Sequence, residues 1–153
     1  MPIENIQTAA GATFAVSAAL PATLDEAGFT DAGMTYTTVG EVTDAGEVGG
    51  SYGEATHTPL DSRLVQRLKT SFDAGTQTLQ MAVSSADAGQ GIILDALHSD
   101  ANIAVKITLQ DGTTVYYIGL VTSFPYNIGS VDTIVNTSVT MSINSQPIVV
   151  AAP

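Results

Sequence analysis

The stretch Tyr52–Gln80, YGEATHTPLDSRLVQRLKTSFDAGTQTLQ, decides the fold of this chain of 153 residues. Its first two thirds predict two strands, over residues 52–58 and 62–71, on either side of Pro59-Leu60-Asp61. Proline presets a turn and cannot lie in a central strand, so these three residues predict the connection between the two strands. The stretch therefore begins as a strand, a turn and a returning strand.

The last third of the stretch predicts a second turn and a third strand. Phe72-Asp73-Ala74-Gly75 contains the aspartate and glycine that turns favour, because aspartate bonds its own backbone and glycine adopts positive φ. Residues 76–84 then place Leu79, Met81 and Val83 on one face and Thr78, Gln80 and Ala82 on the other. This alternation is typical of a strand with one buried face.

The rest of the chain continues in the same manner and predicts a mainly β fold. We expect further strands over residues 12–20, 34–42, 103–109, 115–124 and 133–143, with Val135, Val139, Met141 and Ile143 inward in the last of these. Asp111-Gly112 predicts a tight hairpin. The strand 115–124 is apolar on both faces, so it is either central or covered by another subunit.

One amphipathic helix is expected, over residues 84–98. Ser84 is its predicted N-cap, with Asp87 three residues later, and Gly89, Ile93 and Leu97 form an apolar stripe. A shorter helical turn near Asp25 and Glu26 is an alternative to irregular structure in residues 22–33. The single long helix must lie across a sheet and cover it. The expected architecture is thus a β-sandwich or barrel-like sheet flanked by one helix.

The domain organisation follows from length and composition. We expect a flexible N-terminal arm over residues 1–11, one domain over 12–145 and a short apolar tail over 146–153. The tail either packs on a neighbour or forms a C-terminal edge strand or frayed end. Charged residues make up 12% of the chain, against about 25% in typical soluble proteins. A surface with few charges is a first indication of self-assembly.

The charge balance argues against a nucleic-acid-binding groove. Fifteen acids and four bases give a formal net charge of −11, whereas such grooves neutralise phosphates with lysine and arginine. An acidic wall would still let DNA pass without sticking. Net negative charge also simply keeps a protein soluble, which is the alternative explanation.

A glycine-rich acidic segment, residues 43–51, is predicted to be a loop. A compact domain rarely keeps a long loop without a use for it, although it could equally be a disordered hairpin tip. Asp44 and Glu47 lie in this loop and Glu54 follows it. Asp-Ala-Gly occurs here and at three further places, beginning at Asp31, Asp73 and Asp87; three copies predict turns and the fourth the start of the helix.

Three of the four bases, Arg63, Arg67 and Lys69, fall within seven residues. All three have odd numbers, so in a regular strand they would point to one face. Such a basic stripe could pair with acids of the same sheet or of a neighbouring subunit, where it would fix the register of assembly. A solvated strand face is an equally good interpretation, since exposed ion pairs contribute only ~0–1 kcal/mol.

No arrangement of residues predicts catalysis, a cofactor or a metal. There is no cysteine, and the two histidines, His57 and His98, are far apart in sequence. Nucleotide-binding glycine loops, a nucleophile elbow and calcium-binding loops are all absent. No segment reaches the ~20 apolar residues of a membrane helix, and the N-terminus lacks a signal peptide, so no membrane insertion is expected.

The same stretch resembles the tail tube proteins, or major tail proteins, of long-tailed bacteriophages with non-contractile tails. The similarity lies in HTPLD at His57–Asp61, the basic run after it, the turn Phe72–Gly75 and Thr78-Leu79-Gln80. The order of the predicted elements extends it from about Phe14 to Ile143. No immunoglobulin-type C-terminal domain, which some tail proteins carry, is present in this sequence.

The resemblance implies a structural virion protein and not an enzyme. Its subunits would form hexameric rings whose sheets join into one barrel, and the rings would stack into the tail tube through which DNA is ejected. The implied partners are other copies of the chain, a tape measure protein, a tail terminator and baseplate or tip proteins, with phage DNA passing through the lumen without specific binding. The implied location is the tail of the virion, assembled in the host cytoplasm.

On this interpretation the loop over residues 43–51 reaches out of the ring and packs on neighbouring subunits. Asp44, Glu47 and Glu54 would then help to line the lumen or the joint between rings, and Arg63, Arg67 and Lys69 would form a contact between subunits. Two other functions remain open. One is the tube of a contractile tail, gene transfer agent or secretion system, and the other is a secreted β-sandwich adhesion module.

Overall fold

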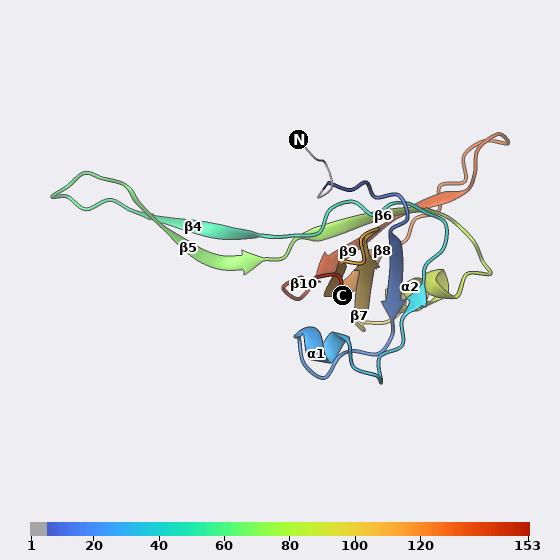
Figure 1. Cartoon of the computed structure of the whole chain (residues 1–153). Coiled ribbons are helices and arrows are strands. Elements are labelled where there is room, and N and C mark those ends of the chain that lie inside the picture. Colours follow the sequence, from blue (N-terminus) through green and yellow to red (C-terminus); the bar gives the residue numbers. More distant parts are fainter. Residues whose placement is uncertain (1–5) are drawn as a thin grey trace.

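A computed structural model describes residues 6–153 (Figure 1). The chain is mainly β, as predicted, with a sheet curled into a half-barrel. The elements in chain order are β1 (Thr13–Ser17), α1 (Glu26–Phe29), β2 (Thr37–Thr38), β3 (Val42–Asp44), β4 (Ser51–His57), β5 (Gln66–Asp73), β6 (Thr76–Ala82), α2 (Ala88–Leu97), β7 (Ile103–Thr108), β8 (Thr114–Ser123), β9 (Asn136–Ile143) and β10 (Ile148–Val150).

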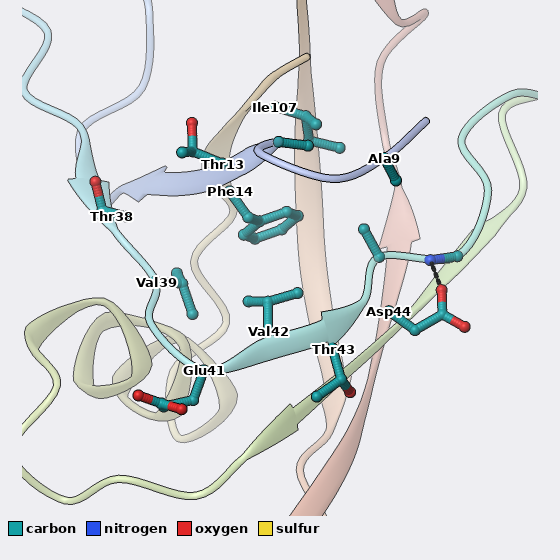
Figure 2. Close-up of a pocket in the computed structure, with 13 residues that line it drawn as sticks. Ala9, Thr13, Phe14, Thr38, Val39, Glu41, Val42, Thr43, Asp44 and Ile107 are labelled. Atoms are coloured by element: carbon teal, nitrogen blue, oxygen red, sulfur yellow. Dashed lines mark hydrogen bonds between the residues drawn. The ribbon is translucent and has the colours of Figure 1, made fainter. Parts of the chain in front are cut away.

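The main sheet is antiparallel and runs in the order β2-β1-β7-β8-β9-β6-β3, with β10 paired to β8. The first and last strands of this order, β2 and β3, are consecutive in the chain. Because the sheet curls, its two ends come together on one side, where β3 lies close to β1 and β7 (Figure 2). The strands β4 and β5 form a separate two-stranded sheet.

The concave side of the half-barrel holds the main core. Alternating strand residues fill it, including Leu79 and Met81 from β6 and Val139 and Met141 from β9, all almost fully buried. The predicted Asp111-Gly112 hairpin connects β7 and β8, with Gly112 at a φ of 94°. Val135, predicted to point inward, is instead exposed. It precedes β9, which begins at Asn136 and not at residue 133 as predicted.

The central strand β8 is covered on both faces, and this chain supplies both covers. Tyr117 and Val121 belong to the main core, while Tyr116 and Ile118 form a second cluster with Phe29 of α1. The rings of Phe29 and Tyr116 stack at a centroid distance of 5.5 Å. The second cover also includes Ile148 and Val150 of β10, so the apolar tail forms an edge strand in this chain. The predicted domain boundaries themselves stay a prediction, and residues 1–5 of the arm lie outside the described residues.

Helix α2 is shorter than the predicted helix over residues 84–98. The N-cap is Asp87, whose carboxylate accepts a hydrogen bond from the Gly89 N–H, and Ser84 lies one turn earlier. Ser84 is held elsewhere, because its N–H donates to Oε1 of Gln90. The predicted apolar stripe packs on the sheet through Ile93 and Ala96. The short helix α1 is capped by Asp25, as the alternative for residues 22–33 proposed, and hydrogen bonds from Thr23 and Gly28 lower the pKa of that carboxyl.

The strand predicted over residues 34–42 is broken into β2 and β3. Glu41 adopts a φ of 61°, the left-handed region, and the Gly40 N–H donates to Oδ2 of Asp87 at 2.6 Å. This contact ties the chain to the start of α2, so the backbone leaves one edge of the sheet and joins the other. No pattern in the sequence marks a left-handed residue other than glycine or asparagine.

All four Asp-Ala-Gly sequences form the local structure that was predicted. In each, the glycine N–H donates to the side chain of the aspartate two residues earlier, at 2.7–3.3 Å, for the pairs that begin at Asp31, Asp44, Asp73 and Asp87. Three of these turns connect strands or loops, and the fourth opens α2. The aspartates are therefore occupied with backbone structure.

Candidate assembly surfaces

The hairpin β4–β5 projects from the half-barrel into solvent (Figure 1). Every residue of both strands is exposed, and no strand of the main sheet pairs with either of them. A two-stranded hairpin on its own is at best marginally stable in water, and stable sheets need a third strand or a packed face. This element therefore lacks the burial that stabilises every other long strand of the chain.

One face of the hairpin carries a row of charged and aromatic side chains. Nε of Arg67 lies 3.2 Å from Oε1 of Glu54, and Nζ of Lys69 lies 4.9 Å from the centre of the Tyr52 ring. The Tyr52 ring also packs against Phe72 at a centroid distance of 5.0 Å. The side chains of Arg67 and Glu54 are 67% and 58% exposed, so the ion pair contributes little by itself.

The basic stripe predicted from residue parity is only partly present. Arg67 and Lys69 lie in β5 and share a face, because their cross-strand partners Thr56 and Glu54 are two residues apart in β4. Arg63 lies in the turn between the strands, with a φ of 55° and its N–H bonded to the carbonyl of Pro59. Strand parity does not apply to a turn residue, so the prediction was wrong for Arg63.

The turn and the second face of the hairpin expose large apolar side chains. Leu60 is 99% exposed, and Leu64 and Leu68 are each 65% exposed. Leucines in a strand pattern usually indicate a buried face. The sequence alone does not show that nothing in the chain covers these leucines. Exposed leucines gathered on a projecting element are typical of surfaces that associate with another protein.

The acidic segment over residues 43–51 is not a projecting loop. Nε2 of Gln77 donates to the Ala45 carbonyl at 2.7 Å, and Ala45 and Val48 pack against the main core. A Cβ atom on Gly46 or Gly50 would meet backbone carbonyl oxygens at 2.6 and 2.1 Å, so glycine permits the close approach. The element that projects is the hairpin that follows.

The three acids proposed to line a lumen or joint are spread over different elements. Asp44 ends β3 and bonds the Gly46 N–H, Glu47 lies in the anchored segment, and Glu54 pairs with Arg67 on the hairpin. The structure does not gather them into one site. Their place in an assembly stays a proposal.

A second apolar projection was missed by the sequence analysis. The connection between β8 and β9 extends from the opposite side of the half-barrel (Figure 1). It exposes Tyr126, Ile128, Val131 and Ile134 at 53%, 68%, 97% and 75%. Five apolar residues between Pro125 and Asn136, interrupted by Gly129 and Ser130, were the available signal.

The convex face of β6 and β9 is polar and carries no charge. Cross-strand pairs join Thr76 to Ser142, Thr78 to Thr140 and Gln80 to Ser138. Hydroxyl and amide groups therefore cover a continuous strip of sheet. Such a strip stays hydrated and offers neither charge nor an apolar surface.

A groove of about 370 Å³ lies where the two ends of the curled sheet meet, between β1 with β7 and β3 (Figure 2). Phe14, Val39 and Ile107 form its apolar floor. Glu41 and Asp44, at the two ends of β3, also line it, and none of its lining residues is basic.

Among residues 6–153, no group of three or more histidine, aspartate or glutamate side chains could hold a metal ion. None of the helices in this part of the chain is long and apolar enough to cross a membrane. His57 lies exposed in β4, and His98 follows the last turn of α2.

Solved structures share this fold. The chain is similar to the sheath/tube terminator of an extracellular contractile injection system, PVC, with a TM-score of 0.67, 12% identity and coverage of 98% of this chain and 100% of the other. It is also similar to the SPP1 tail tube, with a TM-score of 0.63, 14% identity and coverage of 90% and 75%. A tail protein of an empty gene transfer agent particle matches with a TM-score of 0.60, 15% identity and coverage of 95% and 100%.

No family model and no curated protein sequence matches the chain. The resemblance to tail tube proteins is confirmed as a resemblance of fold. The fold is that of tube, terminator and baseplate-associated proteins of tails and injection systems.

Proposed function

We propose that this chain is a structural tube subunit, which assembles into hexameric rings that stack into a phage tail tube and conduct DNA during ejection. The projecting hairpin β4–β5 is the observation that carries this proposal, since it exposes apolar residues on an element that the chain itself does not stabilise. The open ends of the sheet at β2 and β3 offer further edges that neighbours can extend.

The proposal assigns each surface a role. The uncharged strip on β6 and β9 lines the lumen, where it lets DNA pass without specific binding. The acids Asp44, Glu47 and Glu54 lie near the joint between subunits or rings, and Arg67 and Lys69 lie on the contact made by the hairpin. No catalytic role, cofactor or membrane insertion is part of this function.

The partners and location follow from the same proposal. Other copies of the chain are the main partners, and a tape measure protein, a tail terminator and baseplate or tip proteins set the length and ends of the tube. The protein belongs to the tail of the virion and is assembled in the host cytoplasm. Among the solved structures, the SPP1 tail tube and the gene transfer agent tail support this choice by fold.

A ring that ends a tube, or the tube of a contractile system, is the second candidate. The match to the PVC sheath/tube terminator, with a TM-score of 0.67 against 0.63 for the SPP1 tail tube, is the observation behind it. The two candidates differ in what the purified protein builds, because a terminator stops at single rings whereas a tube subunit continues to stack.

Electron microscopy of the concentrated protein in negative stain, with size-exclusion chromatography, tests the proposal. Hollow tubes of variable length are the expected result, single rings would favour the terminator, and a monomer at every concentration would contradict self-assembly. The matched variant replaces Tyr52–Phe72 by Asn-Gly. Ser51 and Asp73 are cross-strand partners, so a two-residue turn closes the chain between them. It should keep the melting temperature of the parent, lose from its circular dichroism only the β signal of the two removed strands, and form no rings.

A further inference from the structure

We propose that the groove between β1, β7 and β3 binds the hairpin tip, Pro59–Val65, of a second copy of this chain. The inference rests on the proposed function, because it names the contact by which one subunit would hold the next. It concerns two features that lie far apart within one molecule, the groove at the ends of the curled sheet and the turn at the end of β4.

The groove has the composition of a site for an apolar segment with positive charge. Its floor is formed by Phe14, Val39 and Ile107, and Figure 2 shows the Phe14 ring and the Val42 side chain facing one another across it. Glu41 and Asp44 stand at either end of β3 along its rim. A ligand that fills the floor and places a cation at the rim would satisfy both features.

The hairpin tip has the matching composition. Leu60 and Leu64 are 99% and 65% exposed, and Asp61 and Arg63 lie between them in the turn. The Arg63 N–H bonds to the carbonyl of Pro59 at 3.0 Å, which closes the turn and gives the tip a defined shape. Arg67 and Lys69 follow on β5. An apolar pair of side chains with one cation, Arg63, thus stands at the end of a projecting arm.

The charges of the chain are divided between the same two regions. Residues 51–73 hold three acids and three of the four bases, so all of the net charge of −11 lies in the remainder of the chain. Lys106, the fourth base, lies 5.6 Å from the centre of the Tyr36 ring. Bodies of two copies therefore repel one another, whereas the hairpin, whose acids and bases balance, can approach another copy without that net repulsion.

The tip of the same molecule does not reach the groove. Asp44 and Gly46 line the groove beside the base of the hairpin, and the hairpin extends away from them (Figure 1). The strands β4 and β5 have 7 and 8 residues, so the tip lies roughly 25 Å from the base of the hairpin, at about 3.3 Å per residue. The occupant must therefore come from another copy. A contact between a tip and a groove uses two different surfaces, so it repeats from copy to copy and builds a ring or a filament.

Cysteine cross-linking tests this contact, and the chain has no native cysteine to interfere. The double variant Leu64→Cys with Thr43→Cys places one thiol at the tip and one on β3 beside the groove. A short bis-maleimide should convert the concentrated protein into a ladder of multimers. The control, Leu64→Cys with Asp100→Cys, has its second thiol before β7, at the end of the strand opposite Ile107, and should give no ladder.

Charge reversal gives a second, independent readout. Glu41→Lys and Arg63→Glu should each raise the concentration needed for assembly at least about tenfold, and the two changes together should restore it. Normal tubes from both single variants, or a ladder only from the control pair, would overturn the groove contact and leave the proposed tube function intact. Failure of the unmodified protein to form any multimer, by microscopy and by cross-linking, would remove both proposals.

Discussion

The half-barrel and the hairpin β4–β5 are built from strands of similar length and similar residues, yet their surroundings are opposite. Leu79 of β6 is fully buried, whereas Leu68 of β5 is 65% exposed. The half-barrel gains its stability from buried contacts within the chain, whereas the hairpin has only exposed contacts between its own two strands. Substitutions in the two regions should therefore separate folding from assembly.

The largest effect is expected from the matched pair of leucines. Leu79→Ala should lower the free energy of unfolding by about 2–5 kcal/mol, because it opens a cavity in a fully buried position. Leu68→Ala should change the same quantity by less than about 0.5 kcal/mol and reduce assembly instead. Urea unfolding of the dilute protein measures both. Equal losses of stability would contradict the distinction between the regions.

A smaller effect is expected where the half-barrel holds the base of the hairpin. The Tyr117 hydroxyl donates to the Gln77 side chain, which in turn donates to the Ala45 carbonyl at 2.7 Å. Both side chains are buried, and burial raises the pKa of Tyr117. Gln77→Leu leaves the hydroxyl and the carbonyl without partners and should cost about 1–3 kcal/mol.

Hydrogen exchange should show faster opening of residues 45–50 in Gln77→Leu. The double variant with Tyr117→Phe should recover part of the loss, because it removes one of the two stranded polar groups. If the single and double variants were equally stable, the connection through Gln77 would have no role in fixing the base of the hairpin.

The second cluster should weaken in alkali. Burial, and then the neighbouring Tyr116, raise the pKa of Tyr36 from 10.0 to about 12. The folded protein favours the neutral phenol, so its contribution to stability is complete below pH 10.0 and is lost as the pH rises through about 12. Tyr36→Phe should flatten this part of the stability profile. The same loss in both proteins would assign it to another group.

The smallest effect is expected on the hairpin of the free chain. Glu54→Gln breaks the ion pair with Arg67, whose partners are more than half exposed, and should change the free energy of unfolding by only ~0–1 kcal/mol. Thermal unfolding at low and moderate salt measures it. A loss well above this range would show that the hairpin is stabilised within the single chain.

Local patterns in the sequence were sufficient for most strands of the half-barrel, but not for β2 and β3. The alternation of Ile103, Val105 and Ile107 and the Asp111-Gly112 turn predicted the β7–β8 hairpin, because both signals lie within a few residues. The turns at the Asp-Ala-Gly sequences were predictable for the same reason. The break at Glu41 was not, since a left-handed glutamate depends on the distant Asp87.

The candidate surfaces were less accessible to sequence reasoning. Leu64 and Leu68 have the pattern of buried residues, and only the path of the chain shows that nothing covers them. The groove combines residues of β1, β3 and β7. Thr13 and Ile107 both line it although they lie far apart in the sequence, and β3 meets them because the sheet curls. Arg63 was assigned to a strand because its turn conformation has no sequence signal.

The most direct test of the dependence of the hairpin on neighbours is amide hydrogen exchange of β4 and β5, in the dilute monomer and in the assembled protein. The amides of these strands should exchange rapidly in the monomer and become protected on assembly, while β7 and β8 stay protected in both. Equal protection of β4 and β5 in the two states would contradict the claim that neighbouring copies stabilise the hairpin.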